Sequence, residues 1–139
     1  MGVLRRDSTG CHSLMVALGS QLTQFSASTA VIDGDGAQSY FDLDRAANAV
    51  AAALIQAGVT SGSVVATVCP AGRWWLAGSF GVWRAGGVLL PLEASHPPAD
   101  LRHPITDSAV THVLCTPATN GLAQELLSLI HISEPTRPY

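Results

Sequence analysis

Two apolar runs separated by a helical segment constrain this fold more than any other feature of the sequence. The runs Val64–Cys69 and Val88–Leu92 contain mostly β-branched and aliphatic residues and show no alternation with polar ones. Strands of that kind are buried on both faces, which is typical of parallel sheets. The segment Trp74–Ala85 between them places Leu76 and Phe80 at helical spacing. We therefore predict two neighbouring parallel strands joined by a right-handed helical crossover.

A β-hairpin is predicted before this unit, within Thr29–Phe41. The dipeptide Asp35-Gly36 favours a type I′ turn, because both central positions of that turn take positive φ. The alternative is a calcium loop, whose first, third and twelfth positions would be three aspartates: Asp33, Asp35 and Asp44. Gln38 stands where such a loop needs glycine, so we expect no calcium there.

The segment Asp42–Gly58 has the clearest helical pattern of the chain. Its apolar residues repeat along one face: Leu43, Ala47, Val50 and Leu54. We predict that Asp42 caps the N-terminus of this helix and that Gly58 takes the C′ position after its last turn.

A shorter helix and another strand are predicted farther along the chain. Pro98 suits the first position of a helix, whereas Pro104 interrupts the same helix because its ring clashes with the carbonyl of Asp100. We therefore expect two short helical turns or one kinked helix, followed by a strand within Thr111–Thr116.

Charge and composition exclude several classes of partner. The formal net charge is −3 and the sequence has no basic patch, so we expect no nucleic acid. The apolar run that begins at Trp74 lasts only about ten residues before Arg84, well short of the ~20 that a membrane span needs. Three widely spaced cysteines without metal-ligand spacing are typical of reduced thiols in an intracellular protein, whether cytoplasmic or organellar: Cys11, Cys69 and Cys115.

No motif in the sequence supplies a catalytic, cofactor-binding or metal-binding residue. The glycine spacing at positions 81–86 matches that of a phosphate loop, but Gly87 and Val88 replace the lysine and hydroxyl residue that hold phosphate and magnesium. The chain contains seven arginines and no lysine. His96 and His103 lack a third ligand at helical spacing, so we predict no metal site.

Two segments resemble the N-terminal region of the adenylate-forming superfamily, which includes acyl-CoA synthetases, peptide-synthetase adenylation domains and luciferases. The first is QSYFDLDRAANAVAAALIQAGVTSGSVVATV, and the second is GVWRAGGVLLPLEASHPPADLRHPITDS. The resemblance implies an α/β fold: a partial parallel sheet with flanking helices, preceded by a short β-hairpin. Five residues make the malonyl-CoA synthetase-like branch the most similar one: His96, Pro97, Leu101, Asp107 and Ser108.

The resemblance also implies a reaction for the parent protein. ATP and a carboxylate would give an acyl-adenylate and pyrophosphate, and coenzyme A would then take the acyl group, with malonate as a candidate substrate. The family stabilises the transferring groups with a Ser/Thr/Gly-rich phosphate loop, Mg²⁺ and a mobile lysine. The chain has neither the loop nor the lysine, so we expect it to bind no cofactor and to be inactive alone. The alternative is a complete, small flavodoxin-like binding or interaction module without catalysis.

The sequence divides into three predicted parts. Residues 1–28 form an N-terminal lead-in with a helix, and residues 29–126 form part of the AMP-binding N-terminal subdomain. Residues 127–139 form a non-native tail, because Leu127 to Arg137 resemble, letter for letter, a translated transposase-end adapter of sequencing libraries. The alternative is a natural amphipathic tail. On the adapter interpretation, the native gene continues beyond this chain.

Overall fold

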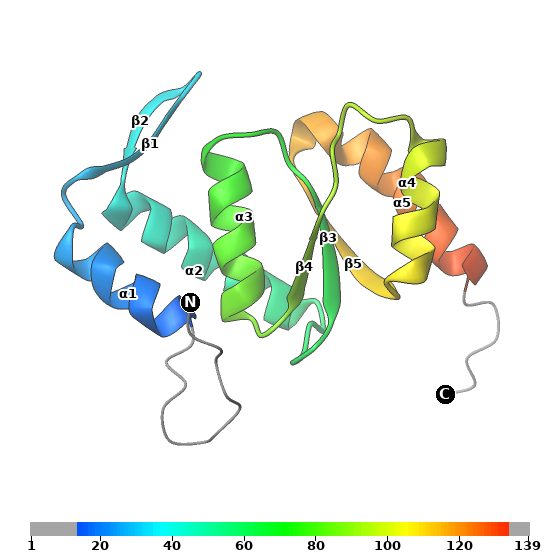
Figure 1. The fold of residues 1–139 in the computed structure, drawn as a ribbon, viewed down its shortest axis with the longest axis horizontal. Helices are drawn as coiled ribbons and strands as arrows, with labels where there is room; N and C mark the ends of the chain where they lie inside the picture. The colour runs from blue at the N-terminus through cyan, green and yellow to red at the C-terminus, as the bar shows by residue number, and fades with distance from the viewer. Residues whose placement is uncertain (1–13, 134–139) are drawn as a thin grey trace, which may run out of the picture.

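The computed structural model describes residues 14–133, which form both helices and strands (Figure 1). In chain order these are α1 (Leu14–Gln24), β1 (Thr29–Asp33), β2 (Gly36–Ser39), α2 (Tyr40–Gln56), β3 (Val64–Val68), α3 (Arg73–Arg84), β4 (Val88–Pro91), α4 (Pro98–Asp107), β5 (Val110–Cys115), the 3-10 turn η1 (Pro117–Thr119) and α5 (Asn120–Ser133). The architecture is α/β, as predicted.

A three-stranded parallel sheet forms the centre, in the order β4-β3-β5. Val64 of β3 lies opposite Val88 of β4, and Ala66 lies opposite Leu90. On the other side, β3 pairs in parallel with β5. The predicted strand–helix–strand unit is confirmed, because β3 and β4 are adjacent and parallel and α3 connects them.

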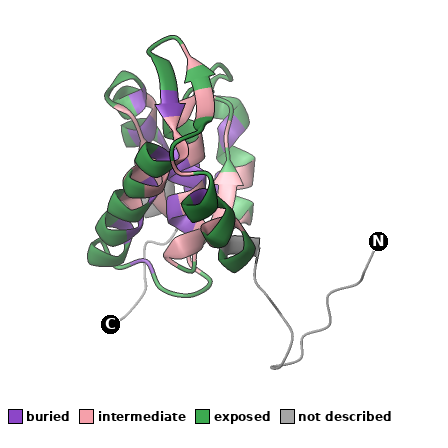
Figure 2. Ribbon diagram, turned by 90° about the vertical axis from the view of Figure 1, so that its left-hand side faces the viewer, coloured by how far each residue is buried: buried purple, intermediate pink, exposed green. Residues whose placement is uncertain are grey.

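Helices cover both faces of this sheet (Figure 1). Leu54 of α2 and Val82 of α3 pack against Val65 on one face. The other face carries Ala66 and Val68, which pack in one cluster with residues of α4 and α5. Val65, Ala66 and Val68 are fully buried, and Figure 2 shows such buried residues gathered between the helices. Burial on both faces explains why β3 shows no alternation of apolar and polar residues.

Small residues allow α3 to approach its neighbours closely. A Cβ placed on Gly81 would overlap the side chain of Val50 in α2 and lie 3.2 Å from the carbonyl oxygen of Ala47. A Cβ placed on Gly78 would lie 2.9 Å from Leu114 in β5. Glycine at these two positions therefore sets the separation of α3 from α2 and from the sheet.

An ion pair also joins α2 and α3. Arg84 donates to the Asp44 carboxylate at 2.6 Å, to the Asn48 side-chain oxygen at 2.8 Å and to the Asp44 carbonyl at 3.0 Å. The last turn of α3 is therefore tied to the first half of α2.

Two sequence-based predictions around the hairpin are wrong. The turn is not of type I′, because Gly34 and Asp35 lack positive φ and only Gly36, at 105°, has it. The N-cap of α2 is Ser39 rather than Asp42, since the helix starts earlier and the Ser39 hydroxyl accepts the Asp42 amide at 3.1 Å. The Gly58 prediction is confirmed, with φ 99° directly after the Ala57 C-cap.

The α4 segment forms one helix through Pro104, which excludes two separate turns and leaves the single helix, the other predicted alternative. Pro98 occupies its first position, as predicted. Leu101 and Ile105 are 4% and 1% exposed in the core cluster with α5. Their burial offsets the hydrogen bond that proline cannot donate.

Helix α5 crosses the predicted boundary at Leu126. That side chain is fully buried, and Leu129 packs against the same cluster. The adapter origin of residues 127–139 stays a prediction.

Candidate functional site

Two hollows lie at the carboxyl edge of the parallel sheet, beyond the last residues of β3, β4 and β5. This edge is where open α/β sheets bind ligands, because the loops that leave the strands diverge there. The larger hollow encloses about 710 Å³ and the smaller about 390 Å³, and both volumes fall in the range of small-molecule sites.

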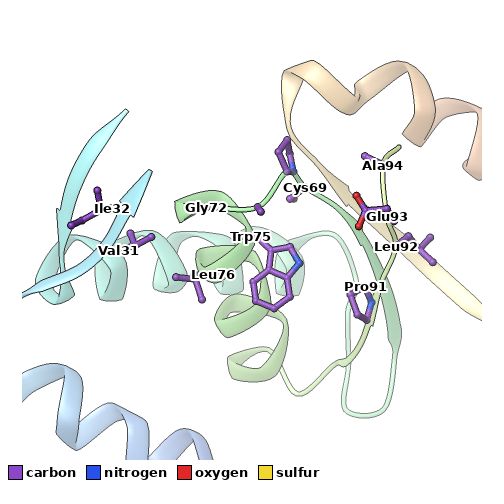
Figure 3. A pocket seen from close by; sticks show the side chains of 12 residues that line it. Val31, Ile32, Cys69, Gly72, Trp75, Leu76, Pro91, Leu92, Glu93 and Ala94 are labelled. Carbon is purple, nitrogen blue, oxygen red and sulfur yellow. The ribbon is translucent and has the colours of Figure 1, made fainter. Parts of the chain in front are cut away.

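Four segments line the larger hollow (Figure 3). They are the hairpin residues Val31–Ile32, the loop Cys69–Gly72 after β3, Trp75–Leu76 at the start of α3, and Pro91–Ala94 at the end of β4. The β1–β2 hairpin and the sheet edge thus form opposite walls of one hollow.

The chemistry of the larger hollow is mainly apolar. Glu93 supplies its one carboxylate, and no lining residue carries a positive charge. Cys69 is 8% exposed and its thiol donates to the Leu114 carbonyl at 3.9 Å. Burial raises the pKa of the Cys69 thiol, so it stays protonated at neutral pH and is a poor nucleophile. This hollow has no group that neutralises a phosphate.

The smaller hollow is lined by the hairpin turn Asp33–Asp35, the loop Pro70–Ala71, Arg73–Trp74, and Thr116–Ala118 after β5. Arg73 is its one cation. That guanidinium is already engaged by Asp33, at 2.8 Å from Nη2 and 2.9 Å from Nε. The site therefore has no unpaired positive charge for an anionic ligand.

Asp33 makes further contacts at the start of α3. Its Oδ2 accepts the backbone amide of Arg73 at 3.0 Å, and its Oδ1 accepts the Asp35 amide at 3.0 Å. The hydrogen bonds from the Arg73 side chain and amide hold the pKa of Asp33 well below its usual range. Gly72 fits here because it has φ 134° and because a Cβ would lie 3.1 Å from Asp33 Oδ2.

The residues weighed as metal ligands do not come together. Asp33 pairs with Arg73, whereas Asp44 pairs with Arg84. His103 lies on the surface, 3.4 Å from Asp107. Within residues 14–133, no group of three or more His, Cys, Asp or Glu side chains is placed to hold a metal ion.

The structure tests the predictions about the cysteines and about a membrane span only within the described residues. Cys69 and Cys115 are free thiols, whereas Cys11 lies outside the described residues. No helix in the described part of the chain combines the length and apolar character required to cross a bilayer.

Sequence reasoning predicted no site at this edge, although it weighed Asp33 and Asp35, which line the smaller hollow, as calcium ligands and rejected them. The ends of the predicted strands pointed to it, since Cys69 and Leu92 close the two apolar runs. The pairing of Asp33 with Arg73 left no signal in the sequence, because it joins residues 40 positions apart through tertiary packing.

Comparison with known proteins gives a consistent family. The family model described as AMP-binding enzyme matches residues 18–137. Malformin synthetase mlfA from Aspergillus brasiliensis is 34% identical over 97 residues, which are 70% of this chain and 2% of that protein.

Two solved structures share the fold. The anthranilate CoA ligase AuaEII in complex with anthranoyl-AMP has a TM-score of 0.74 at 18% identity, covering 84% of this chain and 22% of that one. The nonribosomal peptide synthetase FmoA3, bound to α-methyl-L-serine-AMP, has a TM-score of 0.73 at 24% identity, covering 78% of this chain and 12% of that one. The chain therefore spans less than a quarter of each of these three relatives.

Proposed function

Because the chain belongs to the family of AMP-binding enzymes, we propose that it is part of the N-terminal subdomain of an adenylate-forming ligase. The observation that carries this proposal is the family match over residues 18–137, joined to the same fold in two enzymes that hold acyl-adenylates. This family match displaces the alternative of an independent flavodoxin-like module.

The proposed reaction belongs to the parent protein. It joins a carboxylate to the AMP part of ATP, releases pyrophosphate, and passes the acyl group to a thiol. AuaEII with anthranoyl-AMP and FmoA3 with α-methyl-L-serine-AMP support the adenylate as the intermediate.

The described residues do not fit ATP, Mg²⁺ or coenzyme A. Arg73, the one cation that lines either hollow at the sheet edge, is neutralised by Asp33. Glu93 is the one carboxylate of the larger hollow, where a bound divalent cation would need several oxygen ligands. We therefore infer that this chain has a scaffold role in the parent protein.

Two kinds of parent enzyme are candidates, and they differ in the carboxylate that they activate and in the thiol that accepts the acyl group. The sequence resemblance favoured an acyl-CoA synthetase, and the fold shared with an anthranilate CoA ligase supports that candidate. The 34% identity to malformin synthetase and the fold shared with a nonribosomal peptide synthetase favour an adenylation domain that activates an amino acid. The comparisons do not support malonate as the substrate.

The first experiment measures pyrophosphate release by the 139-residue chain with ATP, Mg²⁺ and panels of amino acids and other carboxylic acids. We expect no release above background. Release with any acid would contradict the scaffold role.

The second experiment extends the gene past the codon for Glu125 and assays the longer protein by ATP–pyrophosphate exchange. A Ser/Thr/Gly-rich loop followed by a lysine, together with exchange, would support the ligase. Exchange with amino acids would favour the adenylation domain, whereas exchange with other acids and an acyl-CoA product would favour the CoA ligase. A stop codon without the loop would contradict both.

A further inference from the structure

The β1–β2 hairpin stands away from the rest of the molecule (Figure 1) and is attached near its two ends. At its base, Tyr40 donates its amide to the Ser28 carbonyl at 2.9 Å, and Phe41 donates to Ser26 at 3.0 Å. Near its tip, Asp33 binds the start of α3. Between these points Ile32 is 78% exposed. The hairpin is therefore held at its base by backbone hydrogen bonds and near its tip by the contacts of Asp33 with Arg73.

The contact between the hairpin and α3 uses both oxygens of the Asp33 carboxylate. Asp33 accepts from the Arg73 amide, Nε and Nη2 at 3.0, 2.9 and 2.8 Å, and Arg73 Nη2 also donates to the Gly36 carbonyl at 3.0 Å. The side chains of Arg73 and Asp33 are only 18% and 14% exposed. A bidentate, largely shielded pair of this kind is stronger than an ordinary surface ion pair.

The charged groups around this pair are few. Asp35 and Asp42 lie near enough to act on Arg73, and both are acidic. They favour the charged guanidinium but offer no second cation for Asp33. Removing Arg73 would therefore leave Asp33 among like charges.

One strand of the hairpin, β2, also contains a buried polar atom without a hydrogen-bond partner. Gln38 in β2 is 9% exposed, and its side-chain oxygen has no hydrogen-bond partner. A buried oxygen without a partner opposes the closed position, because opening would return it to water. The contacts of Asp33 with Arg73 thus stabilise the closed hairpin, whereas the unpaired Gln38 oxygen destabilises it.

The hairpin belongs to both hollows at the sheet edge. Val31 and Ile32 line the larger one, and the turn that begins at Asp33 lines the smaller one. We propose that Asp33 and Arg73 form a latch that holds the hairpin closed as the common wall of both hollows, and that breaking the latch releases the hairpin. The proposal goes beyond the scaffold role and does not depend on the ligase reaction.

Hydrogen exchange of the backbone amides at pH 7, read by mass spectrometry, tests the latch. In Asp33→Asn and in Arg73→Gln, the amides of β1 and β2 should exchange at least tenfold faster, whereas those of β3 and β5 keep their rates. The double variant should exchange no faster than the faster of the two single variants, since both changes break the same contact. Unchanged hairpin rates, or equal acceleration in β3 and β5, would overturn the proposal.

Asp44→Asn is the matched control, because it breaks the ion pair of α2 with Arg84 and leaves the contacts between Asp33 and Arg73 in place. Its hairpin rates should equal those of the unmodified chain. If Asp33→Asn prevents folding, Arg73→Lys answers the same question. Lysine keeps the charge but not the paired geometry, so intermediate hairpin protection is expected. Full protection in Arg73→Lys would contradict the latch.

Discussion

The carboxylate of Asp33 lies where the β1–β2 hairpin contacts the start of α3. Its carboxylate serves as a non-local cap for α3, whose N-cap Gly72 has no side chain to offer. The Arg73 contacts lower the pKa of Asp33 in the folded chain, whereas an unfolded aspartate titrates near pH ~3.9. Folding therefore releases a proton from this group in acid solution.

The pH dependence of stability follows from that difference. The contribution of Asp33 is fully present above about pH 4 and is lost as the pH falls toward the lowered pKa of the folded state. We expect Asp33→Asn to lower the urea midpoint at pH 7, and the difference from the unmodified chain to shrink below about pH 4. Circular dichroism during urea titration measures both.

Asp107→Asn serves as the control, because that carboxylate is 69% exposed and its contact with His103 is long. Its effect on the urea midpoint should be small at every pH. A gap between Asp33→Asn and the unmodified chain that stays constant down to pH 2 would show that Asp33 contributes through shape rather than charge.

Among the elements, α2 and α3 have the most restrictive contact, at Gly81. Alanine there should destabilise the fold, since overpacking costs roughly 1–3 kcal/mol and outweighs the roughly 1 kcal/mol that alanine adds to helix propensity. Gly19→Ala in α1 is the matched control, because no atom of the described residues outside the local helix backbone and the chain neighbours lies within 4 Å of the added methyl group. It should stabilise by about 0.5–1 kcal/mol. Chemical denaturation compares the two, and equal stabilisation would contradict the close contact.

The sequence predicted the elements whose pattern reflects burial. Val64–Cys69 lies between two helical layers, so its composition alone identified a parallel strand. The turn at Gly36 and the cap at Ser39 depended on backbone angles that several turn types share. Helix α4 continued through Pro104 because of tertiary burial, and the latch depends on tertiary contact as well. The local sequence pattern could predict neither the continuation of α4 through Pro104 nor the contact between Asp33 and Arg73.

For the whole molecule, the exposed edges of the sheet matter most. Among the described strands, β4 and β5 each pair on one side, and Val88 at the start of β4 is 50% exposed. Open strand edges favour pairing between chains, so we expect concentration-dependent self-association. Val88→Lys should reduce it, because a charged side chain on an edge strand opposes pairing.

Size-exclusion chromatography with light scattering measures this self-association. Ile55→Lys is the control, since Ile55 is 57% exposed but lies on α2 and not on a strand. Its effect should be smaller. Equal effects of the two substitutions would assign self-association to general surface hydrophobicity instead.

The separation of Asp33 and Arg73 along the chain has a kinetic consequence. Their contact closes a loop of 40 residues, and such closures cost entropy before they return any stabilisation. The hairpin should therefore join the fold after the rate-limiting barrier of folding. Asp33→Asn should then speed unfolding and leave the refolding rate nearly unchanged, which gives a φ-value near zero. Stopped-flow chevron plots measure both arms, and a slower refolding arm would place the hairpin in the transition state instead.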